Sequence, residues 1–295
     1  MHIAIYGRHT KTTNYEVLRD FLLYLQTEDI RYSLHSDYAL SLAQHGVLDA
    51  PVQPHKLFEK AEQIAGVDFL YCIGGDGTML DVVHFLGRVP LPVLGVNSGR
   101  LGFLASVSQY ELKPATTDLK RNAWKSDPRT LITLESRPEP IYTEERVGLN
   151  EVTLHKSNSN EMIVIHTFIN GEYLNSYWAD GLIISTPTGS TAYSMACGGP
   201  IISPRSGTFV ITPIAPHSLT VRPIVIPDTS IVSFELETRS GQALVAVDNS
   251  TVTVPHNIEL AVRKADYQLT LVKLPSRSYF NTLRTRLSWG LDTRN

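Results

Sequence analysis

The N-terminal part of the chain alternates short apolar runs with longer segments in which leucines recur at helical spacing. The apolar runs predict four strands, at residues 2–7, 31–36, 68–73 and 92–96. The segments between them predict three helices, at residues 13–27, 56–65 and 78–86. Thr13 and Glu16 form a capping-box signature at the start of the first helix. Alternating strands and helices are typical of βαβ units around a parallel sheet.

From about Thr130 the pattern changes to β-rich alternation of apolar and polar residues, in runs separated by turn residues. Such runs predict an antiparallel β domain. Asn170 and Gly171 lie between two of these runs and predict a type I′ hairpin, in which both central residues have positive φ. One short helix is expected at residues 191–197, and a basic helix at residues 278–289.

The expected fold is therefore an α/β N-terminal domain with a parallel sheet, followed by a β-rich C-terminal domain. We place the first domain at residues 1–120, the second at residues 121–275 and a C-terminal helical tail at residues 276–295. The tail helix is expected to pack back on the first domain.

Composition narrows the class of protein. The chain has 295 residues, 42% of them hydrophobic, and a formal net charge of −3, as expected for a globular protein of about two domains. The slight negative charge gives no reason to expect nucleic acid or an anionic membrane as the main partner. The two cysteines, Cys72 and Cys197, predict neither a disulfide framework nor a CxxC metal site. Without the pattern of a signal peptide or a membrane span, we expect a cytoplasmic protein.

The stretch "GGDGT" at residues 74–78 ends an apolar strand with three glycines and one aspartate. Backbone N–H groups and a helix N-terminus at such a turn can bind phosphate without a lysine, and glycine lets the phosphate come close. An acidic side chain repels anions, so Asp76 suggests chemistry: a base for a hydroxyl nucleophile, or a carboxylate that holds Mg²⁺. The alternative is an ordinary strand-to-helix turn in which Asp76 only caps the helix.

Two further stretches are candidates for binding a nucleotide. "GVNSGRLGFLAS" at residues 95–106 follows the fourth predicted strand, at the edge where parallel sheets bind ligands. Asn150 and Glu151 are adjacent polar residues in an alternating strand, where the amide can pair with an adenine edge and the carboxylate can accept ribose hydroxyls. The alternatives are a generic loop and two solvent-facing turn residues.

The stretch "STPTGSTAYS" at residues 185–194 places six serine and threonine side chains before a helix of small residues. Its hydroxyls, backbone amides and helix N-terminus can bind a polar ligand, and a plain Ser/Thr-rich loop is the alternative. His217 and Arg222 lie in a segment bounded by prolines, and we interpret this histidine as structural.

In this order, these stretches resemble the NAD kinase family. The resemblance covers nearly the whole chain and rests on five motifs in register. They are "GGDGT" at 74–78, "GVNSGRLGFL" at 95–104, "NE" at 150–151, "DGLIISTPTGSTAYS" at 180–194 and "PHSLTVRP" at 216–223. The family is similar in fold to diacylglycerol kinases and, more distantly, to phosphofructokinases.

The resemblance implies transfer of the γ-phosphoryl group of ATP, or in some members of polyphosphate, to the 2′-hydroxyl of the adenosine ribose of NAD⁺. The product would be NADP⁺. The first domain would then bind nucleotide and the second NAD⁺. A divalent metal ion, usually Mg²⁺, and a homodimer or homotetramer are implied as well, with ATP and NAD⁺ as the small-molecule partners.

The resemblance also assigns roles to single residues. Asp76 matches the proton acceptor, and Gly77 matches a contact to the dinucleotide. Asn150 and Glu151 match the pair that holds the adenosine portion, and Asp180 matches a second acidic contact.

The remaining implied contacts lie in two turns. Thr191, Ala192 and Tyr193 match the segment that wraps the substrate, with the tyrosine covering it. Ser194 and Ala196, in the same turn, are further candidates for substrate contacts, the latter through backbone or packing because relatives often carry serine there. In the phosphate loop the candidates are Gly74, Gly75 and Thr78.

The chain departs from the family pattern in places. Asp81 stands where many members have a basic or small residue, and could alter metal or phosphate contacts or simply face solvent. His84, one turn further on, could supply a phosphate contact instead. Late in the β domain the chain reads "VDNS" where an Asp-Gly pair and a longer polar residue are common. We expect Asn249 to take the left-handed conformation there, and Ser250 to make a shorter contact.

Two alternative functions share this fold. A lipid kinase of the diacylglycerol type would carry "GGDG" too, but should present a basic or apolar membrane-facing surface. A non-enzymatic NAD(H) sensor would be expected to lose the base, so the presence of Asp76 argues against it.

Overall fold

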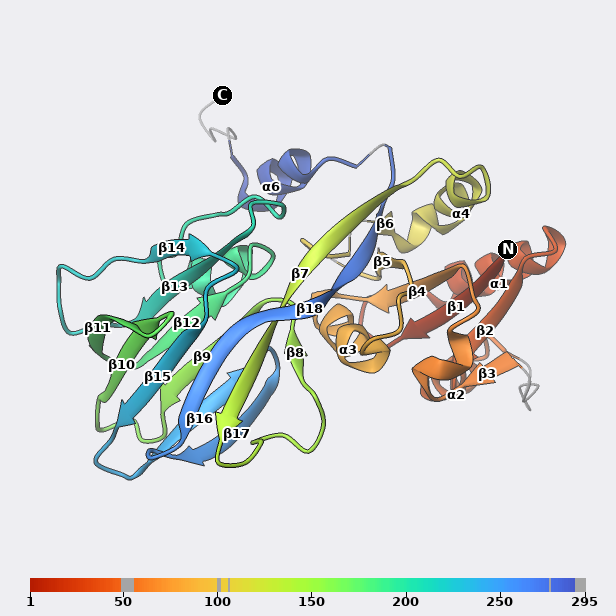
Figure 1. Cartoon of the computed structure of the whole chain (residues 1–295). Helices are drawn as coiled ribbons and strands as arrows, with labels where there is room; N and C mark the ends of the chain where they lie inside the picture. Colours follow the sequence, from red (N-terminus) through yellow and green to blue (C-terminus); the bar gives the residue numbers. More distant parts are fainter. Residues whose placement is uncertain (49–55, 100–101, 106, 276, 290–295) are drawn as a thin grey trace. The chain divides into compact units, whose positions relative to one another are not determined.

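A computed structural model describes residues 1–48, 56–99, 102–105, 107–275 and 277–289. The chain forms two compact units, which are Met1–Pro128 with Leu269–Asn295, and Arg129–Gln268 (Figure 1). No helix in the described ranges is long and apolar enough to cross a membrane.

The first unit is built on a parallel sheet of order β3-β2-β1-β4-β5. Its strands are β1 (His2–Gly7), β2 (Arg31–His35), β3 (Leu57–Phe58), β4 (Phe69–Gly74) and β5 (Val93–Asn97). A short β6 (Val107–Ser108) and the end of β18 (Glu259–Lys273) also pair with β5. Because β1 lies between β2 and β4, the strand order reverses there, and open α/β sheets bind ligands beyond the carboxyl ends of strands at that point.

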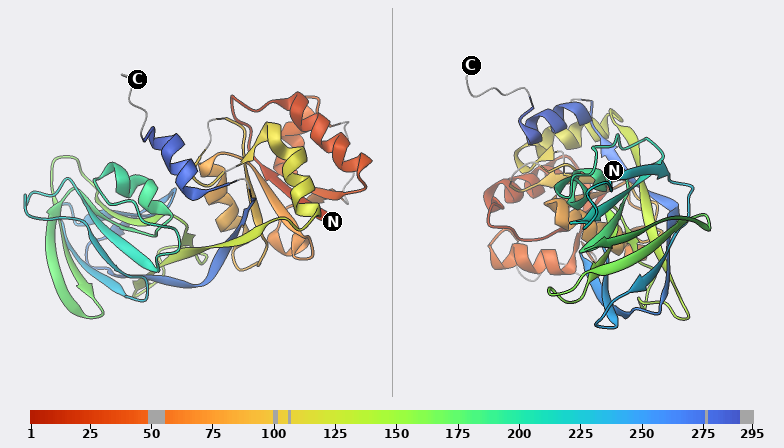
Figure 2. Two further views of the ribbon diagram at one scale, coloured as in Figure 1. Left: turned by 90° about the horizontal axis from the view of Figure 1, so that it is seen from above. Right: turned by 90° about the vertical axis from the view of Figure 1, so that its left-hand side faces the viewer.

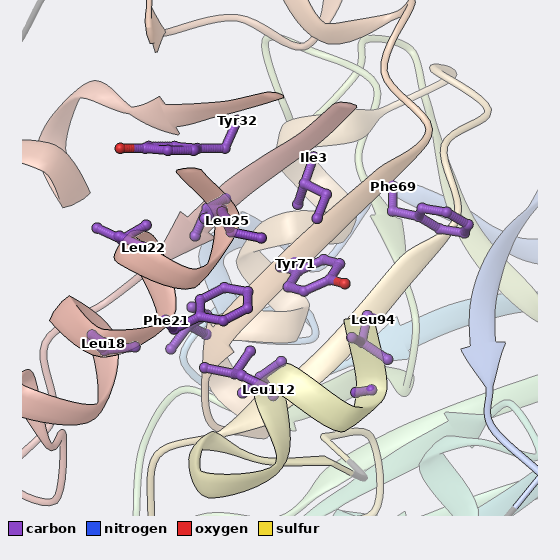
Figure 3. Packing of buried hydrophobic residues seen from close by; sticks show 14 of the residues in the cluster. Ile3, Leu18, Phe21, Leu22, Leu25, Tyr32, Phe69, Tyr71, Leu94 and Leu112 are labelled. Atoms are coloured by element: carbon purple, nitrogen blue, oxygen red, sulfur yellow. The ribbon is translucent and has the colours of Figure 1, made fainter. Parts of the chain in front are cut away.

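Helices cover both faces of this sheet. They are α1 (Tyr15–Thr27), α2 (Ser36–Gln44), α3 (Asp76–Leu86) and α4 (Leu112–Lys120), with 3₁₀ turns at Ala61–Ile64 and Gln109–Glu111. Phe21 of α1 and Leu112 of α4 pack with Tyr71 of β4 in one hydrophobic core (Figure 3). On the other face α3 packs against the sheet, with the rings of Tyr6 and Phe85 5.2 Å apart.

The predicted strands and the parallel sheet are confirmed, whereas two details of the helices were wrong. The first helix is capped by Asn14, whose side chain accepts the N–H groups of Glu16 and Val17 at 3.1 and 3.2 Å. The Thr13 hydroxyl instead accepts the N–H of Thr10. The helix predicted at residues 56–65 is a two-residue strand followed by one 3₁₀ turn.

The C-terminal helix is α6 (Tyr279–Leu287), and it belongs to the first unit. Leu283 is buried, and the Arg286 guanidinium lies 6.0 Å from the ring centroid of Phe103. Just before the helix, Arg277 forms an ion pair with Glu111. The helix therefore packs back on the α/β unit, as the sequence predicts.

The second unit consists of two antiparallel sheets, which Figure 2 shows from two further directions. One has the order β11-β10-β15-β18 with β7 and β8 alongside, and the other β14-β13-β12-β9-β16-β17. The strands are β7 (Lys125–Arg137), β8 (Val147–Gly148), β9 (Glu151–Lys156), β10 (Ile163–Ile169), β11 (Glu172–Ala179), β12 (Gly181–Ser185), β13 (Thr208–Ile214), β14 (Ile224–Pro227), β15 (Val232–Glu237), β16 (Gln242–Val247) and β17 (Ser250–Pro255).

The apolar residues of the two sheets face each other in a single core. Ile165 and Phe234 of the first sheet belong to the same buried cluster as Leu154 of the second. The predicted hairpin is present between β10 and β11, with φ of 52° at Asn170 and 84° at Gly171. The antiparallel β domain is thus confirmed, together with the turn that sets the register of one of its hairpins.

Replacing Gly95 by alanine should destabilise the first unit. An added Cβ would lie 2.6 Å from the carbonyl oxygen of Leu104 and 2.8 Å from the Cα of Ala105, and overpacking of this kind costs about 1–3 kcal/mol. Gly66→Ala is the matched control, because no described atom lies within 4 Å of its Cβ position. In urea denaturation only Gly95→Ala should lower the midpoint, and equal midpoints would contradict this packing.

Candidate active site

The glycine-rich turn between β4 and α3 is open to a ligand. Gly75 is the N-cap of α3, and its N–H donates to the Thr78 hydroxyl at 3.4 Å. A Cβ on Gly74 would overlap the Thr78 side chain, so the first glycine is needed for packing. No described atom lies within 4 Å of the Cβ positions of Gly75 and Gly77, and neither residue has a positive φ.

The second and third glycines therefore serve neither packing nor backbone conformation in the described structure. What they provide is free space beside backbone N–H groups at the N-terminus of an 11-residue helix. The helix dipole favours an anion there. This arrangement supports the phosphate cradle predicted from the sequence.

Asp76 connects this turn to the loop that follows β5. Its carboxylate accepts the N–H groups of Phe103, Leu104 and Ala105 at 2.9, 3.1 and 3.3 Å. Gly102 must be a glycine here, because a Cβ would overlap the Asp76 carboxylate. Asp76 is the first residue of α3 and not its N-cap, so the interpretation of Asp76 as a helix cap was wrong.

Of the candidate stretch at residues 95–106, residues 100, 101 and 106 lie outside the described residues. The described part lies beside the cradle. Ser98 donates its N–H to the Gly74 carbonyl at 3.0 Å, and its hydroxyl lies 2.8 Å from that of Thr10. The side-chain amide of Gln109, which is buried, donates to the carbonyl of Ser98 at 2.9 Å and fixes the loop at this point.

Asp81 does not simply face solvent, which was one of the sequence-based options. Its carboxylate is 3.0 Å from the guanidinium of Arg8, and its side chain is 13% exposed. His84 lies in the last turn of α3, eight residues after Asp76 and so about 12 Å further along the helix axis. This distance does not support a contact from His84 to a phosphate bound at the start of the helix.

In the second unit, a buried carboxylate holds the "NE" segment. Asp248 accepts the N–H groups of Leu149, Asn150 and Glu151 at 2.7, 3.0 and 3.0 Å. Asp248 itself has a φ of 50°. The left-handed residue is therefore Asp248, and not Asn249 as expected.

Glu151 is a buried acid without a hydrogen-bond partner for one of its oxygens. Glu151 is 8% exposed, and its Oε2 has no hydrogen-bond partner among the described residues. Burial, and after it the charge of Asp248, raises the pKa of Glu151 from 4.5 to about 8. An unsatisfied buried carboxyl oxygen is costly, and a ligand hydroxyl would satisfy it.

The "STPTGST" turn folds onto this same segment. Thr186 donates its N–H to the Asn150 carbonyl at 2.8 Å and its hydroxyl to the Leu149 carbonyl at 2.5 Å. A Cβ on Gly189 would overlap the backbone of Asn150, so the close approach requires glycine. The predicted helix at 191–197 is shorter than expected: a 3₁₀ turn at Gly189–Thr191 and the single turn α5 (Tyr193–Ala196).

The predicted contact residues of this turn differ in accessibility. Tyr193 is 41% exposed. Thr191 and Ala192 are half-buried, and Ala196 is exposed. Ser194 is fully buried, with its hydroxyl 2.8 Å from that of Thr212. In the described structure its hydroxyl is engaged by Thr212, which argues against a substrate contact from its side chain.

Asp180 precedes β12 and forms an ion pair with a lysine. Its Oδ1 lies 2.6 Å from the Nζ of Lys156, whose side chain is only 14% exposed. The pair fixes the Asp180 carboxylate at the start of the strand that leads to the "STPTGST" turn.

Comparison with known families covers both units. The ATP-NAD kinase N-terminal domain matches residues 10–122, and the ATP-NAD kinase C-terminal domain matches residues 149–274. An NAD kinase from Cytophaga hutchinsonii is 41% identical over 295 residues, which is the full length of both chains. The chain belongs to the NAD kinase family.

Other members and solved structures agree with this assignment. The NAD kinase of Bacteroides fragilis is 45% identical over 227 residues, covering 77% of this chain and 78% of that one. The crystal structure of yeast NADH kinase complexed with NADH superposes with a TM-score of 0.85 at 25% identity, covering 99% and 89% of the two chains. An Archaeoglobus fulgidus NAD kinase in complex with ATP shares the fold, with a TM-score of 0.72 at 21% identity and coverage of 98% and 99%.

For this NAD kinase family member, each unit gathers part of the predicted site. The first brings the "GGDGT" turn against residues 102–105, and the second brings Asn150 and Glu151 against the "STPTGST" turn. Sequence reasoning missed Arg8 and the holding role of Asp248. Gly102, which leaves room for the Asp76 carboxylate, is the sequence feature that could have indicated the contact between Asp76 and this loop. Within the described ranges, no three His, Cys, Asp or Glu side chains gather as a ready-made metal site.

Glu151→Gln should stabilise the protein increasingly as pH rises. Because folding raises the pKa of this acid, the contribution of Glu151 to the stability of the folded protein is complete below about pH 4.5 and is lost as pH rises to about 8. Across that pH range, the free energy of unfolding of the wild type should become lower than that of the variant by on the order of 2–4 kcal/mol.

Urea denaturation between pH 4.5 and 8.5 measures this difference. Glu172→Gln, which removes an exposed carboxylate of the same unit, is the control and should show no such trend. A difference for Glu151→Gln that stays constant with pH would contradict the assigned environment.

Proposed function

We propose that this protein is an NAD kinase, which transfers the γ-phosphoryl group of ATP to the 2′-hydroxyl of the adenosine ribose of NAD⁺ and forms NADP⁺. The observation that carries the proposal is full-length similarity to NAD kinases together with an Asp76 that lies beside an open cradle. The yeast relative is described as complexed with NADH and the Archaeoglobus relative with ATP, which supports these two kinds of substrate.

The triphosphate of ATP would bind at the start of α3. Gly75 and Gly77 leave room for phosphate oxygens against the backbone, while Gly74 and Thr78 shape the turn. Backbone N–H donors at a helix N-terminus bind anions without needing a lysine. Positioning and charge stabilisation of this kind supply most of the catalysis in phosphoryl transfer.

The adenosine part of NAD⁺ would bind to the second unit. The Asn150 side chain has donors and an acceptor that suit an adenine edge, and the unpartnered oxygen of Glu151 can accept a ribose hydroxyl. Tyr193, with Thr191 and Ala192 before it, would cover the bound dinucleotide. Asp180 would make a second acidic contact while it is held by Lys156.

Asp76 would act as the base. A carboxylate has about four lone-pair sites, and the three loop amides use three, so one site remains for the 2′-hydroxyl. As the ribose oxygen bonds to the γ-phosphorus, the bond from that phosphorus to the β–γ bridging oxygen breaks and ADP leaves. The hydroxyl proton passes to Asp76 as it becomes acidic in the transition state.

A divalent metal ion, most often Mg²⁺ in kinases, would neutralise charge on the triphosphate. The carboxylates near the cradle are already engaged, Asp76 by amides and Asp81 by Arg8. This fits the usual binding of Mg²⁺ through substrate phosphates and water with few protein ligands. A homodimer or homotetramer, a cytoplasmic location and polyphosphate as a second donor stay predictions.

Asp76→Asn should lower kcat for NADP⁺ formation by about 10²–10⁴-fold, the usual contribution of a general base. The assay contains ATP, Mg²⁺ and NAD⁺, and NADP⁺ is measured by a coupled dehydrogenase. Asp20→Asn, an exposed carboxylate of α1, is the matched control and should keep wild-type activity.

A wild type that forms no NADP⁺ would refute the kinase assignment, and a wild type no faster than Asp76→Asn would refute the role of Asp76 as base. Because the Asp76→Asn change would also weaken the loop contacts, hydrogen exchange at Leu104 and Ala105 should be measured alongside the kinetics. Loss of kcat with unchanged exchange identifies the role in proton transfer.

A further inference from the structure

We propose that Arg8 binds the phosphates of the donor nucleotide and that Asp81 positions the guanidinium for this contact. The inference rests on the proposed kinase function. It adds a charged donor to a cradle that otherwise consists of backbone groups.

The backbone places Arg8 beside the cradle. Arg8 directly follows β1, whose last residue, Gly7, pairs with Ile73 of β4. The N–H of Arg8 continues this ladder by donating to the Ile73 carbonyl at 3.1 Å. Arg8 therefore lies next to Gly74, on the neighbouring strand, at the point where the strand order of the sheet reverses.

The side chain of Arg8 reaches the first turns of α3. Its Nη1 lies 3.0 Å from the Oδ2 of Asp81, an ion pair whose geometry is not that of a hydrogen bond. Asp81 is four residues after Gly77, so the two lie one above the other on the same face of the helix. The guanidinium is thus held within about one helical turn of the open N–H groups of the cradle.

The two partners differ in exposure. The side chain of Asp81 is 13% exposed, whereas that of Arg8 is 61% exposed. The Asp81 carboxylate is therefore mostly buried, whereas the Arg8 guanidinium is accessible to solvent. A guanidinium has five N–H donors, and a carboxylate engages at most two of them in a fork. Donors therefore remain for a phosphate oxygen while Asp81 keeps its contact.

Charge gives a reason for this arrangement. Asp76 and Asp81 place two carboxylates near a site that must hold a triphosphate, and like charges at close range repel. Arg8 offsets one of them and, being planar and always charged, suits phosphate recognition. If the pair were only a surface salt bridge, it would contribute little to stability and nothing to ATP binding.

The test is steady-state kinetics of the full-length protein with ATP and NAD⁺ varied in turn. Arg8→Gln should raise KM for ATP by about tenfold or more, as expected for loss of a charge-assisted hydrogen bond, and leave KM for NAD⁺ within about twofold. KM for ATP should also depend less on ionic strength in this variant than in wild type. Arg31→Gln, the same change at the amino end of β2, is the matched control and should leave both constants unchanged.

Asp81→Asn tests the positioning role. It leaves Arg8 in place but frees its guanidinium, so KM for ATP should rise by a smaller factor than in Arg8→Gln. The double variant should then be no worse than Arg8→Gln alone, because Asp81 acts through Arg8. Additive effects of the two changes would overturn the positioning role.

The outcomes separate this inference from the proposed function. A wild type that forms no NADP⁺ refutes the kinase assignment, and the inference with it. A wild type that forms NADP⁺, with an Arg8→Gln variant of unchanged KM for ATP, overturns only the role of Arg8. If Arg8→Gln does not fold, Arg8→Lys decides, because lysine keeps the charge but cannot serve Asp81 and a phosphate as a fork. A raised KM for ATP alone supports the proposal, and a wild-type KM overturns it.

Discussion

In each unit, the candidate site residues depend on one carboxylate that accepts three consecutive backbone N–H groups. Asp76 does so for residues 103–105, and Asp248 for residues 149–151. Loop amides that leave a sheet ladder need other acceptors, and an ionised carboxylate is among the strongest. The two interactions hold the loop on Asp76 and the "NE" segment in fixed conformations.

This constraint explains why glycines and small residues gather around both loops. Gly95 allows Leu104 and Ala105 to lie against β5, and Gly102 allows the loop to come close to Asp76. Gly189 allows the "STPTGST" turn to lie on Asn150. Gly75 and Gly77 differ from these, because nothing described fills the space beside them. The glycines of these motifs therefore serve two purposes, which are the close packing of loops and room for phosphate. The carboxyl of Glu151, buried and short of one partner, is the corresponding opening in the second unit.

The sequence predicted well what depends on local pattern. The strands, the parallel sheet, the antiparallel second unit and the Asn170–Gly171 turn follow from the spacing of apolar residues and from turn chemistry. It did less well where the outcome depends on distant residues. Thr13 and Asn14 are both good caps, and the cap that forms, Asn14, also donates its N–H to the side chain of Gln109, 95 residues away. The bond from Asp76 to Phe103 spans 27 residues, and that from Asp248 to Leu149 spans 99, so neither carries a local signal.

In the mechanism proposed above, Asp76 holds a loop and serves as base at the same time. The most direct test is a crystal structure of the complex with NAD⁺ and a non-hydrolysable ATP analogue. The ribose 2′-oxygen should lie within hydrogen-bonding distance of the Asp76 carboxylate, about 2.6–3.2 Å, with the N–H groups of Leu104 and Ala105 still bonded to it. A 2′-oxygen that lies beyond that reach and beside another acid or base would contradict the role of Asp76 as base.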